Sequence, residues 1–236
     1  MTHIYYLDVS MPGYSDEEKE SFLEKLKPRL HPERRKKLEQ IRFLNDRLCS
    51  AGAGILFAAG LAEAGVHADD IRIGYRGNRK PYLPDVPDVH FNLSHSGERV
   101  MAVFSDHEVG CDIERVVKAR MRVARRFFHK DEQAMLDQLI ASGRENEASE
   151  LFYRYWTLKE SVLKVTGEGI RLPMNAFCIL TEPTVQVRME PGTGSLISGQ
   201  SFTFLEHSLP GYSSCVCVNG NPGDVFFSFQ NLWDVV

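Results

Sequence analysis

The chain has 236 residues, of which 43% are hydrophobic and 25% charged, and its formal net charge is −4. This composition is typical of a globular protein with one substantial core or two small ones, so the length does not fix the number of domains. The slightly negative charge excludes a generally basic nucleic-acid-binding protein. It leaves room for local basic patches that bind phosphate.

Membrane insertion and a disulfide framework are not indicated. The sequence has neither a basic leader followed by an apolar run nor a stretch approaching the roughly 20 apolar residues that span a bilayer. We therefore expect a cytoplasmic protein with no membrane partner. No C-x-x-C pair occurs, and we expect reduced, structural thiols and not metal ligands at all five cysteines: Cys49, Cys111, Cys178, Cys215 and Cys217.

The first half of the chain predicts a strand, three helices and then short strands joined by turns. In order, these are a strand at 3–9, helices at 15–30, 31–47 and 48–65, and strands at 71–75, 90–96 and 100–106. Ser15 is placed to cap the first helix, and Gly65 to end the third.

The second half repeats this order of elements. It predicts a strand at 109–116, a helical stretch at 118–139, a polar break at 141–149, a long helix from Glu150, and strands that include 212–220. The similarity lies in element order and not in residue identity. It predicts an α+β fold, a pseudodimer of two similar halves at 1–106 and 107–236, each with a small, mainly antiparallel sheet packed on helices.

The helical stretch FYRYWTLKESVLKVTG (152–167) places a lysine where an apolar side chain is expected. Lys159 falls among the apolar residues of the helix, whereas Glu160 and Lys164 lie one turn apart on the other half. The simplest interpretation is a solvated Glu160–Lys164 ion pair and a Lys159 stem that lies along the edge of the core. The alternative is that acidic and basic groups converge here for a function.

A pair of carboxylates precedes this helix in the sequence VGCDIE. Asp112 and Glu114 are two residues apart in a segment of strand composition, so their side chains point to the same face. Such a pair can hold Mg²⁺ or Mn²⁺ together with water and a phosphate. Two exposed acids at a sheet edge would give the same pattern.

Several separate cations and polar groups could bind phosphate. These are Ser94 and His95 in NLSHSG, Lys80 before a proline, and the basic helical turn that contains Arg34 and Lys37. Each alone is more simply a solvated side chain. No GxxxxGK[ST] or GxGxxG motif is present, so a Walker or Rossmann nucleotide site is not indicated.

The order of these motifs resembles that of 4′-phosphopantetheinyl transferases of the larger, surfactin-synthetase-activating type. Three blocks carry the resemblance: RKPYLPDVPDVHFNLSHS (79–96), VGCDIE (109–114) followed by RRFFHKDE (125–132), and FYRYWTLKESVLKVTGEGI (152–170). The combination of G-x-D-I-E with a later W-x-x-K-E-x-x-x-K is highly specific. The match fades after about residue 185.

The resemblance implies transfer of phosphopantetheine from coenzyme A to a serine of an apo acyl or peptidyl carrier protein, with release of 3′,5′-ADP. It implies Mg²⁺, with Mn²⁺ as a possible substitute, and a monomer whose two halves hold coenzyme A between them. No nucleic-acid partner is implied. The family's glycine before the lysine of the KP motif is replaced here by Arg79, and a lysine of its basic helix by Arg34.

The resemblance also implies roles for individual residues. Asp112, Glu114 and Glu160 would hold the metal. Lys164 would meet the diphosphate. Beyond the resemblance, we expect Glu160 to accept the serine proton, directly or through water, and Lys159 to be held by Asp112, Glu114 or a phosphate at the seam between the halves. Coenzyme A contacts are implied for Arg34, Lys37, Lys80, Ser94, His95, Asp112 and Lys164.

Two other functions remain compatible with the residues. A non-catalytic module that binds coenzyme A or a carrier protein would not need three metal-binding carboxylates. A Mg²⁺-dependent phosphohydrolase would need the acids but would leave the basic helix and the repeated layout unexplained.

Overall fold

The computed structural model describes residues 1–190, 197 and 199–235, and these residues form two compact units. Unit 1 comprises Met1–Gly74, Pro81–Asp106 and Gly223–Val236, and unit 2 comprises Tyr75–Lys80 and His107–Pro222. The chain therefore leaves unit 1 twice. Each unit is described below by itself.

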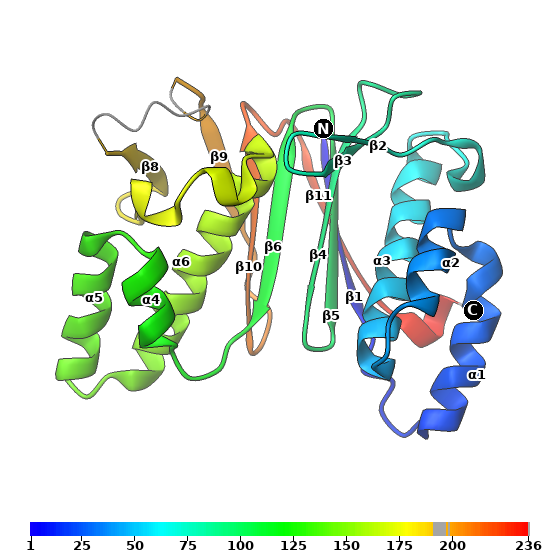
Figure 1. Ribbon diagram of the computed structural model, residues 1–236, viewed down its shortest axis with the longest axis horizontal. Coiled ribbons are helices and arrows are strands. Elements are labelled where there is room, and N and C mark those ends of the chain that lie inside the picture. Colours follow the sequence, from blue (N-terminus) through cyan, green and yellow to red (C-terminus); the bar gives the residue numbers. More distant parts are fainter. Residues whose placement is uncertain (191–196, 198, 236) are drawn as a thin grey trace. The chain divides into compact units, whose positions relative to one another are not determined.

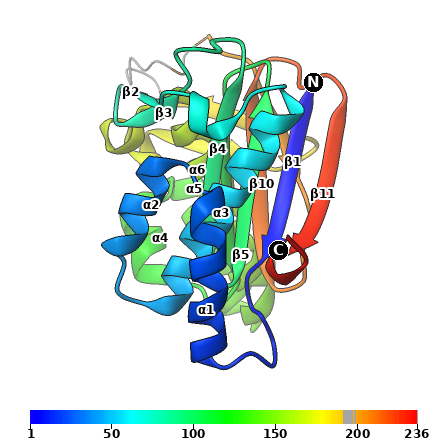
Figure 2. The same ribbon diagram turned by 90° about the vertical axis from the view of Figure 1, so that its right-hand side faces the viewer.

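Unit 1 is built on a four-stranded sheet in the order β11 (Val225–Asn231), β1 (Thr2–Asp8), β5 (Arg99–Ser105), β4 (His90–Ser96). Strand β1 runs antiparallel to β5, and β5 runs antiparallel to β4. Strand β11 pairs with β1 in parallel, and Figure 2 shows the two strands side by side. The last strand of the chain thus completes the sheet begun by the first.

Unit 1 has three α-helices among the described residues: α3 (Leu44–Glu63) packs on this sheet, and α1 (Asp16–Leu26) and α2 (Pro32–Glu39) pack on α3. Ser15 caps α1 in a capping box with Glu18, as its position predicts. In α3, a Cβ on Gly52 would lie 2.9 Å from Leu7 Cδ2, so the missing side chain lets α3 approach β1. The single helix expected at 31–47 is wrong, because the chain leaves helical geometry between α2 and α3.

A short hairpin of β2 (Gly74–Arg76) and β3 (Lys80–Tyr82) takes the chain from unit 1 to unit 2 and back. The residues between the two strands include Gly77 and Arg79, which both have positive φ values, 53° and 61°. Arg79 is a non-glycine residue in the left-handed region, an uncommon conformation for an L-residue. Lys80 belongs to unit 2 although it precedes residue 106.

Unit 2 contains the antiparallel sheet β6 (Val109–Arg115), β10 (Tyr212–Asn219), β9 (Phe202–Glu206) and the hairpin β7 (Phe177–Leu180), β8 (Gln186–Met189). Helix α6 (Glu145–Thr166) packs along β6 and β10, and α5 (Lys130–Ala141) packs on α6 next to α4 (Met121–Phe127) (Figure 1). The core of this unit gathers aromatic and aliphatic side chains of α6 against the sheet.

The mixed α+β architecture that the sequence predicts is confirmed. The helical stretch expected at 118–139 is interrupted, because the His129 side chain accepts a backbone N–H and starts α5 as a new helix. Helix α6 begins at Glu145, earlier than expected, and ends at Gly167 in the left-handed region. All five cysteines are buried thiols. In the part of the chain that is described, the helices are too short or too polar to cross a membrane.

Candidate functional site

Strand β6 and helix α6 lie in close contact at Gly110. A Cβ added to Gly110 would lie 2.3 Å from Val165 N and 2.4 Å from Ser161 O, both backbone atoms of α6. Only glycine therefore permits this contact. Because side chains alternate along a strand, Gly110, Asp112 and Glu114 share one face of β6, and Gly110 shows that this face meets α6.

The Lys164 ammonium binds the buried carboxylate of Asp112. Lys164 Nζ lies 2.7 Å from Asp112 Oδ1 and 3.0 Å from the Cys111 carbonyl oxygen. The Asp112 side chain is 6% exposed and that of Lys164 is 28% exposed. Burial opposes the charge of Lys164 most strongly, but Asp112 and its neighbours outweigh it and raise the pKa of Lys164.

Glu160 lies one turn before Lys164 on α6 and is half-buried. Its pKa is raised, first by burial and then by the negative charge of Asp112, with Glu114 acting in the same direction and Lys164 against it. The carboxylates of Asp112, Glu114 and Glu160 and the ammonium of Lys164 therefore interact electrostatically. The prediction that Glu160 and Lys164 are only a solvated surface pair is wrong, because Lys164 binds Asp112 inside unit 2.

The three carboxylates do not form a closed ligand set in this structure. Among the described residues, a different group in unit 2 has possible metal-ligating atoms that all lie within 4.8 Å of one another. It consists of His129, Asp131 and Cys178. Lys164 holds one oxygen of Asp112, and like-charged carboxylates repel one another. The donor chemistry of Asp112, Glu114 and Glu160 still suits a hard divalent cation such as Mg²⁺, which prefers carboxylate oxygens.

Lys159 points away from this cluster into the core of unit 2. Its side chain is 0% exposed, and its Nζ lies 2.9 Å from Glu132 Oε1, whose side chain is 1% exposed. It also donates to the carbonyl oxygens of Met174 and Phe177, at 2.8 and 2.7 Å. The expected pairing with Asp112, Glu114 or a phosphate is therefore wrong. Lys159 is a structural residue that ties α6 to α5 and β7.

Glu132 completes this buried network. Its two oxygens accept the backbone N–H groups of Ile179 and His129, at 2.7 and 2.9 Å, in addition to the Lys159 ammonium. Buried charges are tolerated only when they are paired and hydrogen-bonded in this way. No role was predicted for Glu132 from the sequence. Glu132 lies in RRFFHKDE at the start of a helix, and this local pattern does not indicate that Lys159, 27 residues later, is its partner.

Lys80 lies in the same unit, beside the end of α6. Its side chain is 8% exposed, and its Nζ donates to Glu108 Oε2 at 2.6 Å and to the carbonyl oxygens of Val109 and Val165. Burial, followed by the charge of Arg76, lowers the pKa of Lys80 to about 7. The ammonium thus already has three acceptors from the protein.

A pocket of about 260 Å³ opens beside Lys80. Its lining comes from the β2–β3 hairpin, the end of α6 and the sheet of unit 2: Arg76, Gly77, Lys80, Glu108, Val165, Thr166, Gly167, Gln200 and Asn219. A Cβ added to Gly77 would lie 3.2 Å from the Gly167 carbonyl oxygen, and the Asn78 N–H donates to that oxygen at 3.3 Å. The hairpin is therefore fixed against the end of α6. Arg76 and Glu108 were not predicted.

The remaining predicted residues belong to unit 1. Arg34 and Lys37 are one turn apart on α2, where burial and then the charge of Arg34 lower the pKa of Lys37. Ser94 and His95 are neighbours within β4, not in a turn, so their side chains leave the strand on opposite faces. Ser94 is buried and His95 exposed. Their contacts with coenzyme A stay predictions.

Comparison with known proteins decides the family. Residues 108–217 match the model of the 4′-phosphopantetheinyl transferase superfamily. Over 216 residues, the chain is 31% identical to 4′-phosphopantetheinyl transferase Sfp of Bacillus subtilis (strain 168), a match that covers 91% of each chain. The chain belongs to the 4′-phosphopantetheinyl transferase family.

Other transferases give similar matches. The chain is 32% identical to 4′-phosphopantetheinyl transferase psf-1 of Bacillus pumilus over 170 residues, which cover 72% of this chain and 71% of that one. The solved structure of Thermotoga maritima holo-[acyl-carrier-protein] synthase (AcpS) superposes on 47% of this chain and 61% of its own, at 15% identity and a TM-score of 0.38. That superposition adds nothing to the assignment.

The contact at Gly110 predicts that this transferase tolerates no side chain there. Gly110→Ala forces a methyl group into the backbone of α6, and we expect it to lower the free energy of unfolding by about 3 kcal/mol or more. Urea denaturation measures the change. Ile113→Val, on the same strand, removes one methylene and should cost only about 1 kcal/mol. A Gly110→Ala variant as stable as the wild type would contradict the close packing.

The Lys159–Glu132 pair predicts a large and non-additive loss of stability. Lys159→Met leaves Glu132 charged in the core, and we expect the free energy of unfolding to fall by about 3–5 kcal/mol. Combined with Glu132→Gln, the loss should be smaller than the sum of the single losses by about 1 kcal/mol or more. Lys130→Met, at an exposed position of α5, is the control and should change stability by less than about 0.5 kcal/mol. Additive losses would rule out the buried pair.

The raised pKa of Glu160 predicts a pH-dependent stability difference. Folding raises this pKa above its ordinary value of 4.5. Ionised Glu160 therefore destabilises the folded protein at pH values above the raised pKa, and this penalty vanishes below 4.5, where both states hold the proton. In a chelating buffer, Glu160→Gln should raise Tm at mildly alkaline pH, and the gain should fade as the pH falls.

Thermal unfolding of the two proteins across this pH range measures the effect. Glu150→Gln, an exposed substitution on the same helix, should show no such dependence. A Glu160→Gln variant that is less stable than the wild type at alkaline pH would contradict the raised pKa.

Proposed function

We propose that this chain transfers 4′-phosphopantetheine from coenzyme A to a serine of an apo carrier protein and releases 3′,5′-ADP. The observation that carries this proposal is the 31% identity to a 4′-phosphopantetheinyl transferase across 91% of the chain. The group of acidic residues and one lysine where β6 meets α6 supports the proposal. Phosphoryl transfer relies on neutralising the charge of the phosphate oxygens and on positioning the reacting groups.

Mg²⁺, or Mn²⁺ in its place, is proposed as the metal, held by Asp112, Glu114 and Glu160. The fit rests on their chemistry: three carboxylates lie close enough for Asp112 and Glu114 to raise the pKa of Glu160, and a divalent cation would relieve that repulsion. When bound, the ion would supply positive charge to the oxygens of the diphosphate.

Glu160 is proposed to accept the proton of the carrier serine, directly or through water. Its raised pKa makes it a stronger base than an ordinary carboxylate, which suits proton removal near neutral pH. The serine oxygen then forms a bond to the phosphorus next to the pantetheine oxygen, and the bond from that phosphorus to the departing 3′,5′-ADP breaks. Lys164, charged and partly exposed, would stabilise negative charge on the diphosphate.

The nucleotide end of coenzyme A is proposed to use the polar pocket beside Lys80. Since Lys80 already donates to Glu108 and two carbonyl oxygens, its main part would be to fix the hairpin that lines the pocket. Arg34, Lys37, Ser94 and His95 are proposed to contact the phosphates. In this proposal residues 1–106 and 107–236 are the two halves of an internal pseudodimer, and the protein acts as a cytoplasmic monomer.

The test is an intact-mass assay of several apo carrier proteins incubated with the enzyme, coenzyme A and Mg²⁺. We expect a gain of one phosphopantetheine unit on at least one carrier, and no gain in the presence of a chelator. Glu160→Gln should slow this transfer about 10²-fold or more, the range for loss of a general base. Glu150→Gln on the same helix is the matched control and should keep the wild-type rate.

Two results would count against the proposal. Release of phosphopantetheine to water without a carrier would favour a phosphohydrolase. Binding of coenzyme A with no transfer to any carrier would favour a non-catalytic module.

A further inference from the structure

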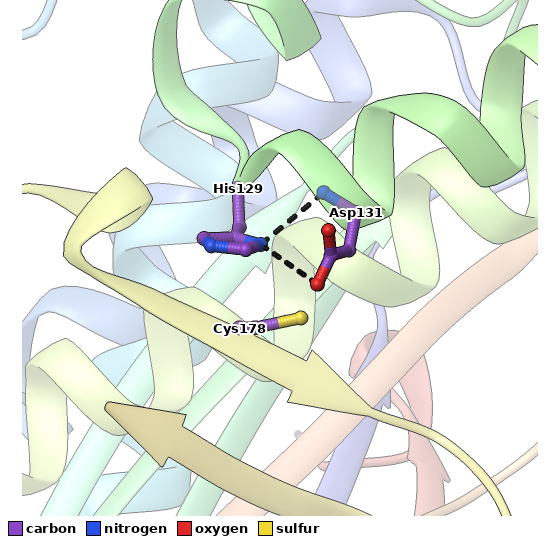
Figure 3. Close-up of side chains that lie close together, drawn as sticks. All are labelled: His129, Asp131 and Cys178. Carbon is purple, nitrogen blue, oxygen red and sulfur yellow. Dashed lines mark hydrogen bonds and ion pairs between the residues drawn. The ribbon is translucent and has the colours of Figure 1, made fainter. Parts of the chain in front are cut away.

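A second group of possible metal ligands lies in unit 2, apart from the carboxylates of β6 and α6. His129 precedes α5, Asp131 is in its first turn, and Cys178 is on β7. Figure 3 shows the three side chains close together. One nitrogen of His129, one oxygen of Asp131 and the sulfur of Cys178 all lie within 4.8 Å of one another. The group thus brings together nitrogen, oxygen and sulfur donors.

The His129 ring lies between two carboxylates. Its Nε2 is 2.7 Å from Glu190 Oε1, and its Nδ1 is 3.6 Å from Asp131 Oδ2. Nδ1 also accepts the Asp131 backbone N–H at 3.2 Å, so the lone pair of the ring is on Nδ1 and the proton on Nε2. A metal-binding histidine usually donates its other N–H to a carboxylate in this way, because that bond fixes the tautomer and orients the ring.

The two other donors differ in exposure. Asp131 is exposed, and its Oδ2 binds the Arg188 guanidinium, an interaction that keeps the pKa of Asp131 low. Oδ2 is also the oxygen that lies 3.6 Å from His129 Nδ1, so an ion bound between them would share this oxygen, which has two lone pairs, with Arg188. Cys178 is buried, and burial, followed by the charge of Glu132, raises the pKa of its thiol to about 11. The thiol therefore holds its proton at neutral pH.

We propose that His129 Nδ1, an oxygen of Asp131 and Cys178 Sγ form a binding site for a borderline-soft divalent cation of the Zn²⁺ class. Imidazole, carboxylate and thiolate are the protein ligands of Zn²⁺, and water can take a fourth position beside the exposed Asp131. Mg²⁺ and Ca²⁺ prefer all-oxygen ligands and would bind poorly here. Asp131 and Glu190 place negative charge beside the ion and offset the positive end of α5.

Binding has two costs that shape the expected behaviour. The ion must displace the proton of Cys178 and the N–H that caps α5, so the site is weaker than a preformed zinc centre. One proton is released for each ion bound. The affinity should therefore rise about tenfold for each unit of pH while the thiol is protonated. A bound ion would link α5 to β7 beside the Lys159–Glu132 pair.

Cobalt(II) is the probe, because a Co–thiolate bond gives a charge-transfer absorption band that oxygen ligands do not. Added to the full chain after removal of metals by a chelator, one equivalent of Co²⁺ should produce this band. Zn²⁺ should abolish the band by displacement, and Mg²⁺ should not. The apparent affinity should increase with pH as described above, and saturating Zn²⁺ should raise Tm.

Two variants and one control decide the assignment. Cys178→Ser should remove the band, whereas Cys49→Ser, a buried thiol in unit 1, should leave it unchanged. Asp131→Asn alters an exposed side chain and so tests the site even when Cys178→Ser fails to fold; it should weaken Co²⁺ binding at least tenfold. Absence of the band in the wild type, or a band that survives in Cys178→Ser or is unaffected by Asp131→Asn, would overturn the proposal.

Discussion

The close contact between β6 and the backbone of α6 at Gly110 is the constraint on which the candidate reaction centre depends. Without a Cβ at this position, the helix lies against the strand, and the side chains two and four residues further along the same face meet the helix. Those side chains are Asp112 and Glu114, and the helix presents Glu160 and Lys164 to them. A larger residue at position 110 would separate these groups, because the obstructing atoms belong to the backbone.

Lys159 and Lys164 of α6 differ in burial and in function, because they have different partners. Lys159 is fully enclosed, pairs with Glu132 and donates to two carbonyl oxygens, so it holds α6 against its neighbours in unit 2. Lys164 is partly exposed and pairs with Asp112 in the acidic cluster, where the proposed function places the diphosphate of coenzyme A. The fixed orientation that Lys159 gives to α6 also fixes the direction of Glu160, its neighbour in sequence.

The local features of the fold could be predicted from the sequence, whereas the partners across the fold could not. The Ser15 capping box, strand β6 and the helical character of 152–167 all follow from residue types and spacing over a few positions. The pairing of β11 with β1 joins the two ends of the chain, and no local pattern indicates it. The break at His129 was missed because an imidazole is not among the usual capping side chains.

In the candidate site, too, local features could be predicted from the sequence and tertiary partners could not. The face shared by Asp112 and Glu114 follows from the period of a strand, and helical spacing places Glu160 and Lys164 one turn apart. Roles in metal and diphosphate binding came from the family resemblance. The choice of Glu132 as the counter-ion of Lys159, and of Glu108 as that of Lys80, depends on tertiary packing. An apolar helix face with one lysine is compatible with a stem at the edge of the core or with a buried partner, and it does not indicate which residue the partner is.

Asp112, Glu114 and Glu160 are proposed to form one electrostatic cluster that is able to hold a divalent cation. A pH titration of ¹³C-labelled glutamate by NMR, with Glu160 assigned by the loss of its signal in Glu160→Gln, tests it most directly. We expect a Glu160 pKa above 4.5 without metal, a lower value in Asp112→Asn, and a marked fall when Mg²⁺ and coenzyme A are added. A Glu160 pKa at its ordinary value that neither Asp112→Asn nor Mg²⁺ changes would contradict it.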